Sequence, residues 1–435
     1  MSGYFEISAS WPEPSERQAD VAEISIRLGD EILTRIADLE SNTNREYFRA
    51  SAVSLSLWFA DNWWRLRCEP VDNTSLPSVD WRMRHELSAA SGGTQWPPVM
   101  IYSGGDRVTF APSLSRQHAA AKLRYLDTRV RTIQASQFEV GIDNFFNLVL
   151  ESCAHSNDAP VLRELVDQLV VERKEPELTA WRRLEACLGY DADEAPSEVV
   201  ERFLAISDRL NERDLEEAAI AAQGAHSADI LESAIAASEA SDVVLDFKLA
   251  ERVDLSKTEL AYPSPWQLAE LAASQLRDGF GLHSAPISDK SLSDLLLARW
   301  DDLKATTETG RNLPYATRLR TTQSKQKVTL ISTRTDAVRF EVSRLLGDAI
   351  WTDESAFGPI SSAKSDRQKF QRAFAQSFLC PLRGVREFVD FDNPKSEDIR
   401  ACAEAFHVHP HVVRNLLVYK YVLPPETLDD QLEVA

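Results

Sequence analysis

The chain has 435 residues and a net charge of −20, with 43% apolar and 27% charged residues. This length is enough for two or three domains, and the composition is ordinary for a soluble globular protein. No run of about 18 apolar residues occurs, so neither a membrane span nor a membrane partner is expected. The start, Met1 to Glu6, lacks the basic and then apolar order of a signal peptide. The widely spaced cysteines predict small buried thiols in a cytoplasmic protein: Cys68, Cys153, Cys187, Cys380 and Cys402.

Charge is distributed unevenly along the chain. Residues 151–257 contain 11 Lys/Arg and 25 Asp/Glu, whereas residues 311–420 contain 18 Lys/Arg and 12 Asp/Glu. An acidic middle beside a basic C-terminal part is consistent with electrostatic docking, inside the chain or to a partner, or with a nucleic-acid surface on the basic part. Solvated helix faces explain the same counts and are the simpler interpretation.

Residues 1–135 are predicted to form a β-rich, tryptophan-dense domain. Residues 51–65 form its expected helix, because Leu55, Phe59 and Trp63 recur at a spacing of four. The paired Trp63 and Trp64 could stack on bases or sugars, but a large aromatic core is the favoured interpretation. Alternating or turn-bounded apolar runs predict strands at 5–8, 21–28, 99–102, 107–110 and 122–134.

Residues 136–262 are predicted to form an acidic helical domain. The run 215–240 is rich in alanine and helix-prone, which suits a small packed helix pair or a mobile arm. Apolar periodicity predicts the other helices at 141–153, 161–171, 178–188 and 198–210.

Residues 263–423 are predicted to form a third domain, followed by an acidic tail at 424–435. Ser264 is a helix cap and Pro265 suits the first helical position, so a helix is expected through Arg277. Strand patterns follow at 315–321 and 327–331.

Two helical segments in this third part carry a family resemblance. The first reads Arg-Phe-Glu-Val-Ser-Arg-Leu-Leu-Gly-Asp over residues 339–348, and the second covers 366–381 and contains Phe374-Ala375 and Pro381. Together they resemble the two-helix zinc core of the ImmA/IrrE family of metallo-endopeptidases. The resemblance covers a little over a third of the chain. It implies an α+β domain of degenerate zincin type over residues 263–423.

The apolar framework matches that family, but the metal-binding positions do not. A zinc peptidase helix uses His-Glu-x-x-His because residues four apart share one helix face, and the Glu acts as general base. In this chain Arg344 and Asp348 stand at the two histidine positions and Leu345 at the base position. Gln368 stands at the position of the third ligand, a Glu in the family. No zinc or other cofactor is therefore expected.

Two interpretations of these replacements remain open. Arg344 and Asp348 have the spacing of a helical salt bridge, with Gln368 as a hydrogen-bond partner, so the trio could stabilise a drifted core. This interpretation is favoured. Alternatively, Arg344 and Arg372 could hold a phosphate or carboxylate in an anion pocket.

Residues 396–406 and 410–419 have a helix-turn-helix outline. The second helix offers Arg414, Asn415 and Lys420 as nucleic-acid contacts, which is a thin set for a recognition helix.

The expected protein is α+β, with a β-rich N-terminal domain, a helical middle and an ImmA/IrrE-like C-terminal domain. The resemblance implies a pseudo-metallopeptidase that binds a protein partner or nucleic acid, in bacterial regulation or in defence against mobile elements. Two alternatives are an active zinc endopeptidase with unrecognised ligands and a DNA-binding regulator.

Overall fold

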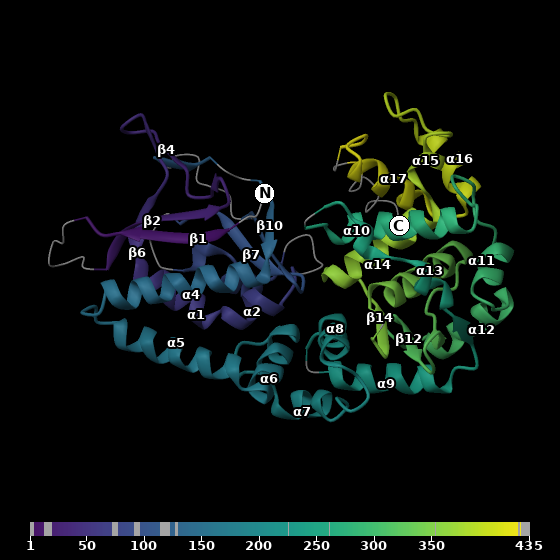
Figure 1. The fold of residues 1–435 in the computed structure, drawn as a ribbon, viewed down its shortest axis with the longest axis horizontal. Coiled ribbons are helices and arrows are strands. Elements are labelled where there is room, and N and C mark those ends of the chain that lie inside the picture. Colours follow the sequence, from purple (N-terminus) through teal and green to yellow (C-terminus); the bar gives the residue numbers. More distant parts are fainter. Residues whose placement is uncertain are drawn as a thin grey trace. The chain divides into compact units, whose positions relative to one another are not determined.

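The computed structural model describes residues 4–427 except 13–19, 72–76, 91–95, 114–121, 127–128, 225, 261, 353 and 425–426. Most of the predicted acidic tail, 424–435, lies outside the described residues. The fold is a mixed α+β arrangement with sheets at the N-terminus and mostly helices after them, as expected from the sequence (Figure 1). No helix in the described part of the chain is long and apolar enough to cross a membrane.

The chain forms two compact units. Unit 1 contains Met1–Leu204, Gln223–Ala225 and Ala363–Asp366, and unit 2 contains Ala205–Ala222, His226–Ser362 and Arg367–Ala435. This division falls at other places than the boundaries predicted at 135 and 262. The middle helices are shared between the units because those up to Leu204 pack with the strands and helices of the N-terminal part, and the next two pack with the C-terminal sheet.

Among its described residues, unit 1 contains three antiparallel sheets. The first has the order β1-β2-β3 with β6 also on β2, the second β10-β8-β7, and the third β5-β4-β9. The strands are β1 (Phe5–Ser10), β2 (Val21–Leu28), β3 (Glu31–Ile32), β4 (Ile36–Asp38), β5 (Thr43–Arg45), β6 (Phe48–Ser51), β7 (Val99–Ser103), β8 (Arg107–Pro112), β9 (Leu123–Tyr125) and β10 (Arg131–Gln134). The strands predicted at 99–102 and 107–110 are confirmed as β7 and β8, which pair antiparallel.

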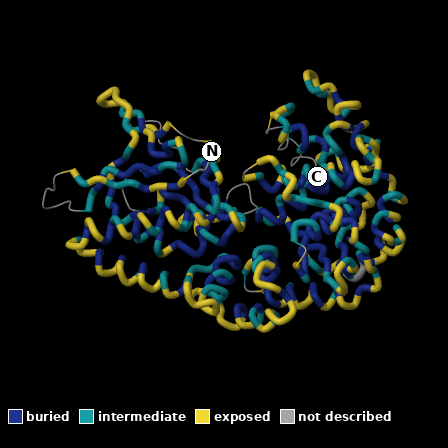
Figure 2. Tube along the Cα trace, in the orientation of Figure 1, coloured by how far each residue is buried: buried dark blue, intermediate teal, exposed yellow. Residues whose placement is uncertain are grey.

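The helices of unit 1 pack beneath its sheets (Figure 1). They are α1 (Ala52–Asp61), α2 (Trp63–Cys68), α3 (Val79–His85), α4 (Ala135–Ser152), α5 (Ala159–Lys174), α6 (Pro176–Cys187) and α7 (Ser197–Leu204), with the 3₁₀ turn η1 (Leu87–Ala89). Helix α5 turns its exposed residues outward (Figure 2).

The tryptophan-rich segment forms the core of unit 1, as favoured from the sequence. Trp63 is 1% exposed, and its ring stacks on Phe138 with centroids 5.9 Å apart. Phe5 stacks on the same phenylalanine from β1, at 5.6 Å. At the contact of α4 with β1 a Cβ on Gly141 would lie 2.6 Å from the carbonyl oxygen of Phe5, so only glycine permits this approach. The five cysteines are buried and none of them is in a disulfide, which agrees with the prediction of buried thiols.

Unit 2 contains one antiparallel sheet in the order β11-β13-β12-β14. Its strands are β11 (Val244–Asp246), β12 (Ala316–Arg320), β13 (Lys325–Thr329) and β14 (Phe357–Ile360). The 3₁₀ turns η2 (Lys248–Arg252) and η3 (Leu255–Lys257) follow β11 in the chain. Two of them, β12 and β13, are the strands predicted in this region.

In the described part of unit 2, ten helices surround or follow this sheet. They are α8 (Glu212–Ala222), α9 (Ser227–Ala240), α10 (Pro265–Gly279), α11 (Asp289–Leu295), α12 (Trp300–Gly310), α13 (Thr335–Trp351), α14 (Asp366–Leu379), α15 (Leu382–Val385), α16 (Ser396–Phe406) and α17 (Pro410–Tyr419). The alanine-rich run forms the pair α8 and α9. Ser264 and Gln267 form the capping box of α10, with Pro265 in its first turn.

Helices α13 and α14 pack closely, as their apolar spacing predicts. A Cβ on Gly347 would lie 2.9 Å from the ring of Phe374, so the glycine sets the approach of the two helices. Phe374 continues a stack with Phe370 and Phe378, at centroid distances of 6.3 and 5.4 Å. Leu345, at the position of the catalytic base in the resemblance, is fully buried in this core.

Candidate functional site

Helix α13 holds Arg344 and Asp348 one turn apart, and both side chains are buried. They lie beside β14, the edge strand of the unit 2 sheet. The approach is tight, because a Cβ on Gly358 of β14 would lie 1.9 Å from Asp348 Oδ2. The site therefore forms where α13 meets β14, with α14 alongside.

Asp348 is bound by cations from two other elements. Arg318 of β12 donates from Nε to Oδ2 at 2.6 Å, and Arg367 of α14 donates from Nε to Oδ1 at 2.6 Å. Gln371 adds a hydrogen bond to Oδ1 at 2.5 Å. Burial acts to raise the pKa of Asp348, but Arg367 and Arg318 outweigh it and lower the pKa to about 2. The expected ion pair of Asp348 with Arg344 is wrong, because both carboxylate oxygens face these other guanidinium groups.

Arg344 turns toward the end of β14. Its Nη2 donates to Ser361 O and to Gln368 Oε1, each at 2.6 Å, and to Gln371 Oε1 at 3.2 Å. Burial and the neighbouring Arg372 lower the pKa of Arg344 to about 9. Arg372 also donates to Ser361 O, at 3.4 Å. The two arginines predicted to hold an anion thus converge on one backbone carbonyl.

Gln368 connects these groups to α8. Its Oε1 accepts from Arg344 and from Ser361 N, while its Nε2 donates to Glu217 Oε1 and to Pro359 O, both at 2.8 Å. The predicted hydrogen bond between Arg344 and Gln368 is therefore present. Glu217 is 5% exposed, so this carboxylate is buried with the rest of the site.

A second carboxylate of α8, Asp214, is fully buried against the start of β14. It accepts hydrogen bonds from Arg367 Nη1 at 3.0 Å and from the backbone N–H groups of Ala356 and Phe357 at 2.8 and 3.1 Å. The hydroxyl of Ser355 donates to it as well. Acidic residues of the middle region thus bind basic residues of the C-terminal region, as the electrostatic docking idea anticipated.

These contacts define what we call the buried charge cluster. It combines three carboxylates with three guanidinium groups, each at most 9% exposed. The six charged members are Asp214, Glu217, Arg318, Arg344, Asp348 and Arg367, and Gln368 and Gln371 connect them. The sequence analysis identified Arg344, Asp348 and Gln368. It missed the others, although Arg367 and Gln371 have the same i, i+4 spacing that drew attention to Arg344 and Asp348.

The cluster also occupies the outer edge of β14. On this side Phe357 N donates to Asp214 and Phe357 O accepts from Arg367 at 2.9 Å. Pro359 has no N–H, and its carbonyl accepts from Gln368. Ser361 N donates to the same glutamine, and Ser361 O accepts from Arg344. At Phe357, Pro359 and Ser361, the backbone N–H and C=O groups that a further strand would pair with are therefore hydrogen-bonded to side chains.

The residues present do not suit a zinc ion. The guanidinium group of Arg344 has no lone pair to donate to a metal ion, and Leu345 has no ionisable group that could act as a general base. Asp348 already binds two guanidinium groups, whose positive charges oppose a divalent cation at that carboxylate. Within the described ranges, no three His, Cys, Asp or Glu side chains come together in a way that could hold a metal ion.

The predicted nucleic-acid contacts are not members of the buried charge cluster: Arg414 and Asn415 lie on α17, and Lys420 follows its last residue. Arg414 and Asn415 are half-buried. Lys420 forms an ion pair with Glu270 of α10, Nζ to Oε1 at 2.7 Å. Part of its charge is therefore already compensated.

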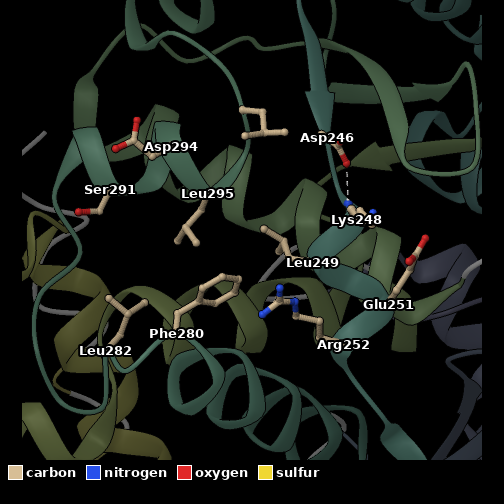
Figure 3. Close-up of a pocket in the computed structure, with 11 residues that line it drawn as sticks. Asp246, Lys248, Leu249, Glu251, Arg252, Phe280, Leu282, Ser291, Asp294 and Leu295 are labelled. Carbon is tan, nitrogen blue, oxygen red and sulfur yellow. Dashed lines mark hydrogen bonds between the residues drawn. The ribbon is translucent and has the colours of Figure 1, made fainter.

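Unit 2 also contains an open cavity of about 660 Å³ between η2, α10 and α11 (Figure 3). Leu249, Phe280 and Leu295 supply apolar walls around its centre. The guanidinium group of Arg252 lies over the Phe280 ring, 4.9 Å from its centroid. Asp294 adds a carboxylate at the rim, so the cavity carries charges of both signs. None of the site residues predicted from sequence lines it.

Comparisons with known proteins return no match: no protein-family model, no curated protein and no solved structure corresponds to this chain.

Proposed function

We propose that the protein is a non-catalytic, ImmA/IrrE-like pseudo-metallopeptidase that acts as a binding component. The observation that carries this proposal is the buried charge cluster. At the positions where the resemblance places two metal-binding histidines and the third ligand, the chain has Arg344, Asp348 and Gln368, and all three are hydrogen-bonded to protein groups.

The strand edge supports the same proposal. Extended peptides bind proteins by adding a strand to an open sheet edge, with backbone hydrogen bonds supplying the affinity. The outer edge of β14 offers no such groups, because Asp214, Gln368 and Arg344 use them at Phe357, Pro359 and Ser361. Opening it would break buried ion pairs, at a cost of about 3–5 kcal/mol for each one broken.

A retained scaffold with an altered site suits a protein that recognises a partner without cleaving it. The resemblance suggests bacterial regulation or defence against mobile elements as the process, and the partner would be a protein or a nucleic acid. The paired helices α16 and α17 are the part of the fold that favours nucleic acid, with Arg414 and Asn415 as its contacts.

Metal analysis tests the non-catalytic part of the proposal. The purified protein is incubated with zinc, dialysed, and measured by elemental analysis beside the Asp348→Ala variant. We expect no stoichiometric zinc in either protein and no cleavage of an unstructured protein substrate. Stoichiometric zinc that disappears in Asp348→Ala, together with peptidase activity, would instead establish an active enzyme with unrecognised ligands.

Salt-dependent binding tests the nature of the partner. Fluorescence anisotropy with a short DNA duplex is measured at rising salt, because phosphate contacts weaken as salt increases. Nucleic acid is supported if Arg414→Ala weakens binding at low salt and the matched Arg400→Ala variant, on the exposed surface of α16, does not. If the two variants bind the duplex equally well, a protein partner remains the proposal.

A further inference from the structure

A second, smaller cavity in unit 2 lies between α10, the junction of α14 with α15, and α17. Its volume is about 240 Å³. The polar groups at its walls include three residues with cationic side chains, Arg277, Arg383 and Lys420, and the hydroxyl of Ser377. It is separate from the buried charge cluster and shares no charged residue with it.

Arg277 of α10 is the unusual member of this wall, because it is a buried cation bonded only to carbonyl groups. Its side chain is 2% exposed. Nε donates to His283 O at 2.7 Å, and the other two nitrogens donate to Phe378 O and Ala285 O. No carboxylate forms an ion pair with it in the described part of the chain. Three of its five N–H groups are used by these bonds, so Nη1 and Nη2 each retain one.

The remaining charges at the cavity offset Arg277 only in part. Lys420 pairs with Glu270 at 2.7 Å, so that carboxylate has a cationic partner. Asp278 lies 3.2 Å from His283, which is charged only when protonated, and the negative charge of Asp278 also acts on Arg277 without forming an ion pair with it. Arg383 is exposed, and it forms no ion pair with any residue that the structure describes. The cavity walls thus hold three cationic side chains, Arg277, Arg383 and Lys420, and two carboxylates, Glu270 and Asp278, which is an excess of positive charge.

The backbone around the cavity holds this arrangement under strain. His283 has a φ of 40°, in the left-handed region that side chains other than glycine rarely adopt. Gly281 precedes it with a φ of 65°. This turn directs the carbonyls of His283 and Ala285 onto Arg277. Strained backbone of this kind persists where the surrounding contacts require it, and it concentrates at binding sites.

We propose that this cavity binds a small anion, a phosphate or carboxylate group of a low-molecular-weight ligand, between Arg277 and Arg383. Planar guanidinium groups match the oxygens of such anions and bind them with charge-assisted hydrogen bonds. Ser377 supplies a hydroxyl donor from α14 on the same wall.

The electrostatics of Arg277 agree with this assignment. Burial lowers the pKa of Arg277 to about 10, because loss of hydration outweighs the opposing effects of Cys380 and Asp278. A bound anion would supply an ion-pair partner for Arg277 in a site of low dielectric. The volume of about 240 Å³ admits a small anion but not a duplex, so a free phosphate or phosphate ester fits better than a polynucleotide.

Isothermal titration calorimetry on the full chain tests the proposal, with inorganic phosphate, glycerol phosphate and acetate as probes at constant ionic strength. We expect saturable binding of at least one probe with one site per chain. Arg383→Ala should weaken that binding about tenfold or more, since hydrogen bonds to charged groups are strong. A preference between phosphate and glycerol phosphate distinguishes the free ion from an ester.

The control is Arg400→Ala, which removes an exposed arginine of α16 that does not line the cavity. Thermal unfolding of each protein without ligand establishes that Arg383→Ala is folded. The proposal is overturned if no probe binds, or if Arg383→Ala and Arg400→Ala bind equally well. It is also overturned if Arg383→Ala weakens binding to a DNA duplex while none of the small anions binds.

Discussion

The buried charge cluster makes a sharp prediction for Asp348→Asn. The asparagine keeps the shape of the side chain and removes its charge, so Arg318 and Arg367 lose the carboxylate that both bind. Leaving a buried charge without its partner costs about 3–5 kcal/mol. A separate estimate comes from the pKa of about 2, which lies below the ordinary 3.8. That difference corresponds to about 2.5 kcal/mol contributed by the ionised form.

The pH dependence follows from the sign of this shift. Because folding lowers the pKa of Asp348, its contribution is fully present above about pH 4 and is lost as the pH falls toward 2. The wild type and Asp348→Asn should therefore differ most near neutral pH and converge in acid. The unfolding free energy lost in Asp348→Asn should exceed the free energy that the wild type loses on protonation of Asp348, since the variant also leaves two guanidinium groups poorly paired.

Native-state hydrogen exchange measures this effect locally, which suits a chain with two compact units. Amides of α13 should exchange two to three orders of magnitude faster in Asp348→Asn, while those of α4 in unit 1 serve as an internal reference. The matched control is Asp336→Asn, which affects a surface pair with Arg334 and should cost less than about 1 kcal/mol. If the two variants behave alike, the ionic account of the cluster is refuted.

Three further changes test other parts of the structure. Gly358→Ala should unfold or strongly destabilise unit 2, because the added Cβ would overlap the side chain of Asp348. The matched variant Gly279→Ala, on α10, should leave the melting temperature equal or slightly higher, because an added Cβ there would meet no other atom. Asp214→Asn should speed amide exchange in α8 by about two orders of magnitude, as expected for a broken buried pair, and unchanged exchange would contradict its role as an anchor. His85→Phe should lower the melting temperature of unit 1 by several degrees, because both ring nitrogens of His85 lie within hydrogen-bond distance of oxygen atoms, one of Ile101 and one of Glu69. An unchanged melting curve would show that these two hydrogen bonds contribute little to stability.

Local signals predicted much of the fold. The cap at Ser264 and the proline after it placed the start of α10, and the two helical segments located at 339–348 and 366–381 are α13 and α14, which share one apolar core. These predictions succeeded because periodicity and capping depend on neighbours within one or two turns.

The contacts of the site could not be read from the sequence in the same way. Local spacing suggested a pair of Arg344 with Asp348, but Asp348 binds Arg318, 30 residues earlier, and Arg367 binds Asp214, 153 residues earlier. A spacing of four favours a pair weakly on an exposed helix. In a buried site the choice of partner is decided by which groups the tertiary fold brings close, and sequence spacing carries no information about that.

The charge balance of the buried cluster restricts how this protein can evolve. Changing Arg344 or Asp348 singly, for example to histidine, leaves an unmatched charge in an interior where each mismatch costs several kcal/mol. Natural domains have only about 5–15 kcal/mol of stability in total. A lineage could alter the cluster by paired, compensating substitutions, but a stepwise path through single replacements passes through variants that fold poorly. The six charged residues therefore make the site difficult to change one residue at a time.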